Sequence, residues 1–155
     1  MSKISRDTPL AEITLRRYEK PTMEGRELVR KLCLSLGLLQ PGDSRDVVVD
    51  MLHTLLKGRQ VREELHSEEI KNRVIASRKE LNLPVMGVAG SNIRRQLKRL
   101  KDLHLIESNN NLYRIGEFSE LSEIFSERIE NFLLGSVLGR VREYVKKVDE
   151  EFKIK

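Results

Sequence analysis

Cysteine and long apolar segments are the first features missing from this sequence. Its 155 residues include one cysteine, Cys33, which cannot close a disulfide within the chain. The sequence has no N-terminal apolar segment of the signal-peptide kind and no apolar run of membrane-spanning length. These absences argue against secretion and membrane insertion, and they predict a cytoplasmic protein without a membrane partner.

Metal-binding and catalytic motifs are missing as well. His53, His66 and His104 lie in different predicted elements, and one cysteine provides no paired-ligand spacing for zinc. Cys33 lies on the apolar side of a predicted helix, where an inert buried thiol is expected. The sequence contains no phosphate-binding glycine loop and no nucleophile elbow. We therefore expect no metal, no cofactor and no enzymatic activity.

Charge is abundant, and its balance is basic. Lys and Arg number 29 against 24 Asp and Glu, which gives a net charge of +5 and a pI of about 9.4. Hydrophobic residues make up 39% of the chain, enough for one core, and the length fits one domain with helical extensions. The charge-rich, aromatic-poor composition is compatible with a thermophilic source, although three consecutive asparagines argue mildly against one.

Apolar periodicity predicts a mainly α-helical chain. Residues 1–21 are interpreted as an N-terminal arm, and Thr22, Ser44 and Ser67 are candidate N-caps. The predicted helices cover residues 22–36, 44–58, 67–83, 91–104 and 119–151, with Gly37 and Gly58 as the stop signals of the first two.

A small hairpin is predicted after the fourth helix. Residues 105–108 and 111–115 have the composition of strands, and Asn109 and Asn110 between them tolerate the positive φ of a tight turn. From residue 44 onward, the resulting order is a helix over 44–58, a helix over 67–83, a turn over 84–90, a helix over 91–104 and the hairpin. The expected organisation is an arm over 1–21, a domain over 22–116 with an extra N-terminal helix, and a C-terminal helical extension over 117–155.

The segment from Ser91 to Glu107 resembles the recognition helix and first wing strand of winged helix-turn-helix regulators. Members of this superfamily often show a small polar cap, an apolar ladder and an acid-terminated exit into the wing. The resemblance covers roughly Asp46 to Ile115, and His104 stands where many members have glycine. It implies three helices plus a β-hairpin wing, with DNA binding as the default role. The matching residues are Ser91, Ile93, Leu97, Leu100, Leu103, Leu105, Ile106 and Glu107.

The predicted helix over residues 91–104 has one apolar side and one basic side. At about 100° per residue, its exposed sides carry five cations suited to the major groove of DNA. Asn92 and Arg95 are the expected base contacts, because Asn can pair with adenine and Arg with guanine. The apolar side consists of Ile93, Leu97, Leu100 and His104, and the expected backbone contacts are Ser91, Arg94, Lys98, Arg99 and Lys101.

Positive charge concentrates around this helix. Residues 84–116 hold six Lys and Arg against two acidic residues, a balance of +4, whereas residues 117–155 hold seven against nine, a balance of −2. The pattern favours sequence-specific binding of double-stranded DNA by a transcriptional regulator, whereas few aromatics are present for stacking on RNA bases. The expected wing contacts are Asn109, Asn110 and Arg114.

Two alternatives stay open. A winged helix also serves as a protein-interaction module or complex subunit without nucleic-acid contact, and an asparagine run is typical of a plain hairpin tip. The C-terminal helix can complete the core or pair with a second copy, and we expect a homodimer whose two recognition helices address neighbouring half-sites. Its a/d seam consists of Leu134, Val137, Val141, Tyr144 and Val148.

Overall fold

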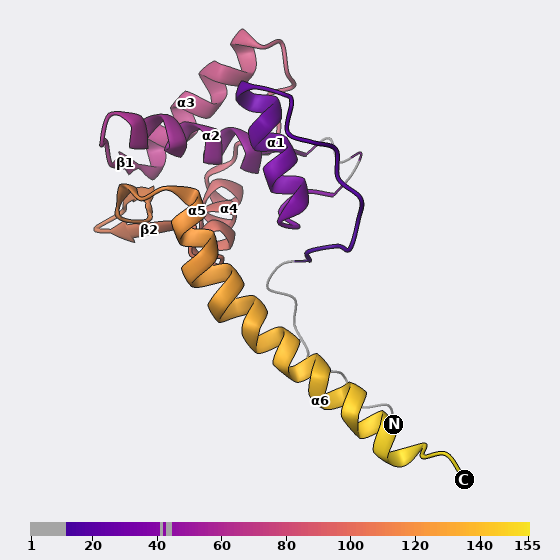
Figure 1. Ribbon diagram of the computed structural model, residues 1–155. Coiled ribbons are helices and arrows are strands. Elements are labelled where there is room, and N and C mark those ends of the chain that lie inside the picture. The colour runs from indigo at the N-terminus through magenta and orange to yellow at the C-terminus, as the bar shows by residue number, and fades with distance from the viewer. Residues whose placement is uncertain (1–11, 41, 43–44) are drawn as a thin grey trace, which may run out of the picture. The chain divides into compact units, whose positions relative to one another are not determined.

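The computed structural model describes residues 12–40, 42 and 45–155. Contacts divide the chain into one compact unit that ends at Phe118 and a second unit, Ser119–Lys155. The described chain is mainly helical with a small antiparallel sheet, as the sequence predicts (Figure 1). The first unit contains α1 (Gly25–Ser35), α2 (Val47–Gln60), β1 (Leu65–His66), α3 (Ser67–Glu80), α4 (Gly90–Asp102), β2 (Ile106–Asn109), β3 (Leu112–Ile115) and a 3-10 turn, Gly116–Phe118.

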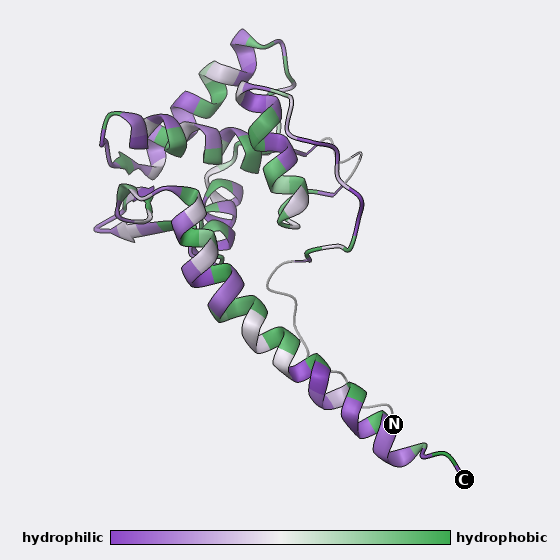
Figure 2. Ribbon diagram, in the orientation of Figure 1, coloured by the Kyte–Doolittle hydropathy of each residue, from purple (hydrophilic) through white to green (hydrophobic). Residues whose placement is uncertain are grey.

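Helix α2 forms the centre of the first unit. It packs against α1, α3 and β3, and most of its residues are buried. Green apolar and purple polar residues alternate along the surrounding helices, as expected for helices that bury one face (Figure 2). The largest fully buried side chains of this unit are Met51, Leu52, Leu55, Leu65, Ile70, Ile93, Leu97, Leu100, Leu105 and Ile115.

The sheet has three antiparallel strands in the order β1-β3-β2. Its hairpin turn consists of Asn110 and Asn111, with φ values of 51° and 62°, so the predicted turn at 109–110 lies one residue too early. Asn109 belongs to β2. The observed register pairs the buried residues Ile106 and Ile115, and a shift by one residue would turn one strand's apolar side chain to the other face.

All four helices of the first unit end in one backbone motif, in which a left-handed residue follows the cap. In α4, His104 has a φ of 62°, and the N–H of Leu105 donates to the carbonyl of Leu100 at 3.1 Å. Helix α4 therefore ends at Asp102, and the predicted end at His104 is two residues too late. The corresponding residues of α1, α2 and α3 are Gly37, Arg62 and Asn82, so α3 ends at Glu80 rather than at residue 83.

Several predicted helix starts are wrong, and the N-cap of α4 is Ala89 rather than Ser91. Helix α1 begins at Gly25 after Glu24, not after Thr22. The N-cap of α3 is His66, whose Nδ1 accepts a hydrogen bond from the backbone N–H of Glu68 at 3.2 Å, so Ser67 is already helical. An imidazole nitrogen replaces the expected hydroxyl as the acceptor for a free amide of the first turn.

Helix α2 differs from its predicted bounds at both ends. It begins at Val47 with Asp46 as the N-cap, and the predicted N-cap Ser44 lies outside the described residues. The helix continues two residues beyond Gly58. This glycine makes room for the returning chain, because a Cβ there would meet the carbonyl oxygen of Glu63 at 3.1 Å and the side chain of Leu65 at 3.5 Å. Gly58 is a packing position within the helix.

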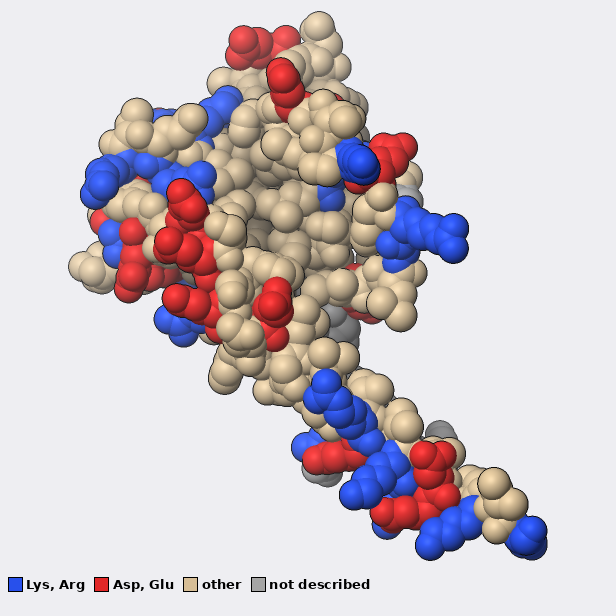
Figure 3. Space-filling view, viewed as in Figure 1, with Lys and Arg blue, Asp and Glu red and all other residues tan. Residues whose placement is uncertain are grey.

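The second unit is one helical stretch that closely follows the predicted range of 119–151. It consists of α5 (Leu121–Ile124), a π-helical segment η2 (Phe125–Leu134) and α6 (Gly135–Glu151). Lys and Arg are intermixed with Asp and Glu along the C-terminal part of α6 (Figure 3). The exposed apolar residues at and beyond the start of α6 are Val137, Leu138, Val141, Tyr144, Val145, Val148, Phe152 and Ile154, each at least 49% exposed.

Candidate nucleic-acid interface

Helix α4 presents the basic face that the sequence predicts. Its inner side is set by Ile93, Leu97 and Leu100, each at most 1% exposed. Leu103 completes this stripe in place of His104, which is half-buried and already lies outside the helix. The exposed cations on the remaining sides are Arg94, Arg95, Lys98 and Lys101.

Arg94 and Arg95 are the most available of these cations. Both side chains are exposed, and neither has a hydrogen-bond or ion-pair partner within the part of the chain that the structure describes. Ser91 is exposed one residue after the helix start, beside backbone amides that have no helical partner. These three residues can accept a ligand without breaking an internal contact.

Lys98 and Lys101 have weak surface partners. The Nζ of Lys98 lies 3.0 Å from a carboxylate oxygen of Asp102 one turn later, with both side chains well exposed. The Nζ of Lys101 donates to the hydroxyl of Ser108 in β2 at 2.9 Å. Exposed pairs of this kind contribute about 0–1 kcal/mol, so both cations remain available to an anion.

Asn92 holds the turn that precedes α4. Its Nδ2 donates to the carbonyl of Gly87 at 2.6 Å, and its Oδ1 accepts from Gln96 at 3.2 Å. Both ends of the amide therefore have internal partners in the conformation described. Reading an adenine edge would require Asn92 to exchange these bonds for base contacts.

Arg99 also has an internal role. Its guanidinium donates to the carbonyl of Leu38 at 3.0 Å and to Gln96 at 2.7 Å, and the side chain is part-buried. Leu38 lies just beyond α1, so this bond ties α4 to the end of α1. The structure thus places a predicted phosphate contact between two helices.

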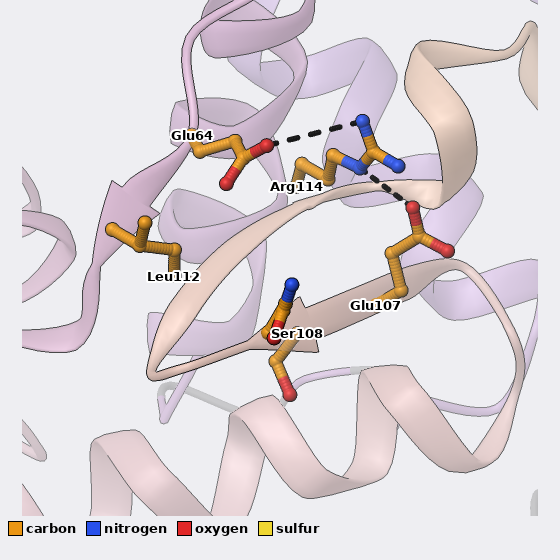
Figure 4. A pocket seen from close by; sticks show the side chains of 6 residues that line it. Glu64, Glu107, Ser108, Leu112 and Arg114 are labelled. Atoms are coloured by element: carbon orange, nitrogen blue, oxygen red, sulfur yellow. Dashed lines mark hydrogen bonds and ion pairs between the residues drawn. The ribbon is translucent and has the colours of Figure 1, made fainter.

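The wing residues are divided between the sheet and the hairpin tip. The Nε of Arg114 donates to a carboxylate oxygen of Glu107 at 2.6 Å, and an Nη lies 3.9 Å from the carboxylate of Glu64 (Figure 4). Its guanidinium also lies 4.9 Å from the ring centre of Phe118. These contacts tie Arg114 to the acidic side of a shallow pocket at the sheet. Asn109 and Asn110 stay exposed at the tip.

The next residue of the tip is bonded to α3. The side-chain nitrogen of Asn111 lies 2.7 Å from Nε2 of His66, whose other ring nitrogen caps α3. This imidazole therefore connects the hairpin tip to the start of α3.

A buried ion cluster supports the turn before α4. Arg78 of α3 donates to Asp46 at 2.9 Å, to Asp50 at 2.6 Å, and through Nε to the carbonyl of Pro84 at 2.7 Å. Arg26 of α1 closes the cluster with bonds of 2.8 Å to each of the two aspartates. The side chains of Asp50 and Arg78 are 1% and 3% exposed. The cluster joins three helices to the start of the 84–90 turn.

Sequence reasoning missed this cluster, although a signal was present. Asp50 interrupts an apolar run in α2, and Arg78 follows the buried Val74 by four residues on the inner side of α3. Burial alone would raise the pKa of the Asp46 carboxyl, but hydrogen bonds from Arg26 and Arg78 outweigh burial and lower the pKa. The aspartate therefore stays ionised at neutral pH.

Comparisons with protein-family models, with curated proteins and with solved structures find no match to this chain. Among the described residues, no group of three or more His, Cys, Asp and Glu side chains is arranged to hold a metal ion. None of the helices in that part of the chain combines the length and apolar character needed to cross a membrane.

Proposed function

We propose that the first unit is a winged helix-turn-helix domain that binds double-stranded DNA through α4. The element order supports this proposal, because a helix, a short strand, two helices joined by a turn and a two-stranded hairpin occur in that sequence. The short first strand pairs with the last strand of the hairpin, which makes the hairpin part of a three-stranded sheet. Helix α4 then occupies the place of a recognition helix.

The exposed basic face of α4 is the observation that carries the proposal. Five Lys and Arg against one Asp give this thirteen-residue helix a charge of +4. Four of the five cations are exposed, on the sides away from the buried stripe. A helix that enters the major groove needs cations toward phosphates and at least one side chain near its N-terminus toward base edges.

The contacts within the unit refine the expected roles. Arg95 is the leading base-reading residue, because it is exposed in the N-terminal half of α4 and has no internal partner among the described residues. Arg94, Lys98 and Lys101 are the proposed phosphate contacts. Asn92 and Arg99 instead position α4, since each is bonded to neighbouring backbone.

Fluorescence anisotropy with mixed-sequence duplex DNA across a salt series tests this proposal. We expect wild-type affinity to fall steeply with salt, because counterions are released from phosphates. Arg95→Ala should weaken binding to a selected site by about 1–3 kcal/mol and relax base preference, whereas Lys98→Ala should weaken all sequences alike.

Lys57→Ala is the matched control, because it removes an exposed cation from α2 rather than α4. It should bind like the wild type. If a folded wild type does not bind at low salt, or if Arg95→Ala and Lys57→Ala behave alike, DNA recognition by α4 is wrong.

We further propose a homodimer through α6, which places two recognition helices on neighbouring half-sites of a regulatory sequence. The support is the row of exposed Val, Leu and Tyr side chains on this helix. Light scattering at micromolar concentration should give twice the monomer mass, and Val141→Glu should return the protein to a monomer. A wild type that is monomeric would remove this part of the proposal.

A protein-interaction module is the second candidate function. The observation in its favour is that Asn92, Arg99 and Arg114, three of the predicted DNA contacts, are bonded within the unit. A folded protein that fails to bind duplex DNA at low salt would favour this function.

A further inference from the structure

An extended segment, residues 12–20, carries a second pair of exposed cations. The segment forms neither helix nor strand, and all of its residues are exposed. Arg16 and Arg17 stand in its middle, and neither has a hydrogen-bond or ion-pair partner among the residues that the structure describes. Leu15 beside them is fully exposed. Nothing within the described first unit neutralises this arginine pair.

The segment is held to α1 at two points. A Cβ on Gly37 would overlap the backbone of Glu12, so the chain crosses directly over this glycine at the end of α1. Glu19 then forms an ion pair of 3.2 Å with Lys31, a residue of α1. The arginine pair lies between these two anchors and is therefore carried on a loop along α1.

One of these anchors is linked to α4. Leu38 follows Gly37, and its carbonyl accepts the hydrogen bond from Arg99 of α4. Glu12 therefore lies close to the point where the end of α1 is bonded to α4. If α4 lies in a major groove, a segment beside α4 lies toward the sugar-phosphate backbone that borders this groove.

We infer that Arg16 and Arg17 contact DNA phosphates that flank the stretch read by α4. This inference rests on the function proposed above. An extended chain covers at most about 3.6 Å per residue, so the backbone of the pair lies within about 18 Å of Glu12. That span equals about five base pairs at 3.4 Å each. The segment thus extends the phosphate contacts beyond α4, with no base-specific role.

The test compares three proteins by the slope of log affinity against log salt on random duplex DNA. Arg16→Gln combined with Arg17→Gln should lower the slope by about 1.8, since each phosphate contact contributes about 0.9. Lys57→Gln combined with Arg62→Gln is the control, because it removes the same charge from exposed positions at the C-terminal end of α2. The control should keep the wild-type slope, and circular dichroism checks the fold of each variant.

A hydroxyl-radical footprint gives a second readout on a selected site. In the variant with Arg16→Gln and Arg17→Gln, the DNA backbone that flanks the site should lose protection, while the stretch bound by α4 should stay protected. If DNA binding is retained and the salt slopes of the Arg16→Gln, Arg17→Gln variant and the control are equal, the inference is wrong and the proposed function still stands. A wild type that does not bind any duplex would overturn both.

Discussion

Replacement of Arg78 by methionine should strongly destabilise the first unit. Arg78 is bonded to both Asp46 and Asp50, and Arg78→Met leaves the buried carboxylate of Asp50 with Arg26 as its remaining ion-pair partner among the described residues, because Arg30 pairs only with Asp46, at 3.9 Å. The carboxylate of Asp50 is 1% exposed, so water cannot replace the lost partner. Breaking a buried pair in this way costs about 3–5 kcal/mol. The carbonyl of Pro84 also loses its hydrogen bond.

Urea unfolding followed by circular dichroism at 222 nm measures this loss. With a slope of about 2 kcal/mol per M, the midpoint should fall by about 1.5–2.5 M. Lys98→Met, which breaks only the exposed pair with Asp102, should change stability by less than about 1 kcal/mol.

A double variant separates charge imbalance from lost packing. Asp50→Leu combined with Arg78→Met removes one charge of each sign and leaves the pair of Arg26 and Asp46. It should regain at least half of the stability lost in Arg78→Met, because apolar replacements of whole buried pairs are often neutral. A loss below about 1 kcal/mol in the single variant, or no recovery in the double variant, would refute the reasoning.

Three further predictions concern the same unit. Because the pKa of Asp46 is lowered in the folded state, the stability that this carboxylate contributes is present above the unfolded pKa and is lost as pH falls through the folded pKa. Asp46→Asn should therefore lower the free energy of unfolding at pH 7. In urea titrations, the difference in unfolding free energy between this variant and the wild type should shrink below about pH 4. Burial raises the pKa of the Cys33 thiol to about 12, so a thiol reagent at pH 8 should react only on unfolding, and rapid reaction of the native protein would contradict this. Gly37→Ala should cost at least about 1 kcal/mol of unfolding free energy, since φ is 76° and the added Cβ would strike Glu12, and an unchanged urea midpoint would count against that contact.

The helices of the first unit were predictable because their buried residues recur at helical spacing. Ile93, Leu97 and Leu100 identified the inner side of α4, and the structure buries all three. The helix ends were less predictable, because they depend on left-handed residues such as Arg62, whose side chain does not signal this conformation. Glycine is the usual residue at this position, and among α1, α2, α3 and α4 only α1 has one there, Gly37.

The short strand β1 could not be found from the sequence. It has two residues, Leu65 and His66, and a pair is too short to show the alternation that identifies a strand. Tertiary pairing with Tyr113 and Leu112 of β3 creates it. The imidazole of His66 also caps α3 and contacts Asn111 at the hairpin tip, so one residue has three roles that periodicity does not reveal.

The two arginines Arg95 and Arg99 explain why a candidate site is harder to predict than a fold. They are one turn apart on the same side of α4, so helical spacing assigns both to a ligand-facing surface. Of these two arginines, Arg99 is bonded to a neighbouring segment, because the chain that leaves α1 brings the carbonyl of Leu38 to its guanidinium, whereas Arg95 stays exposed. Periodicity identifies the side of a helix, whereas the neighbouring chain decides which residue on that side is free to bind. If α4 binds DNA as proposed, a variant of Arg99 should lose stability together with binding, and a variant of Arg95 should lose binding alone.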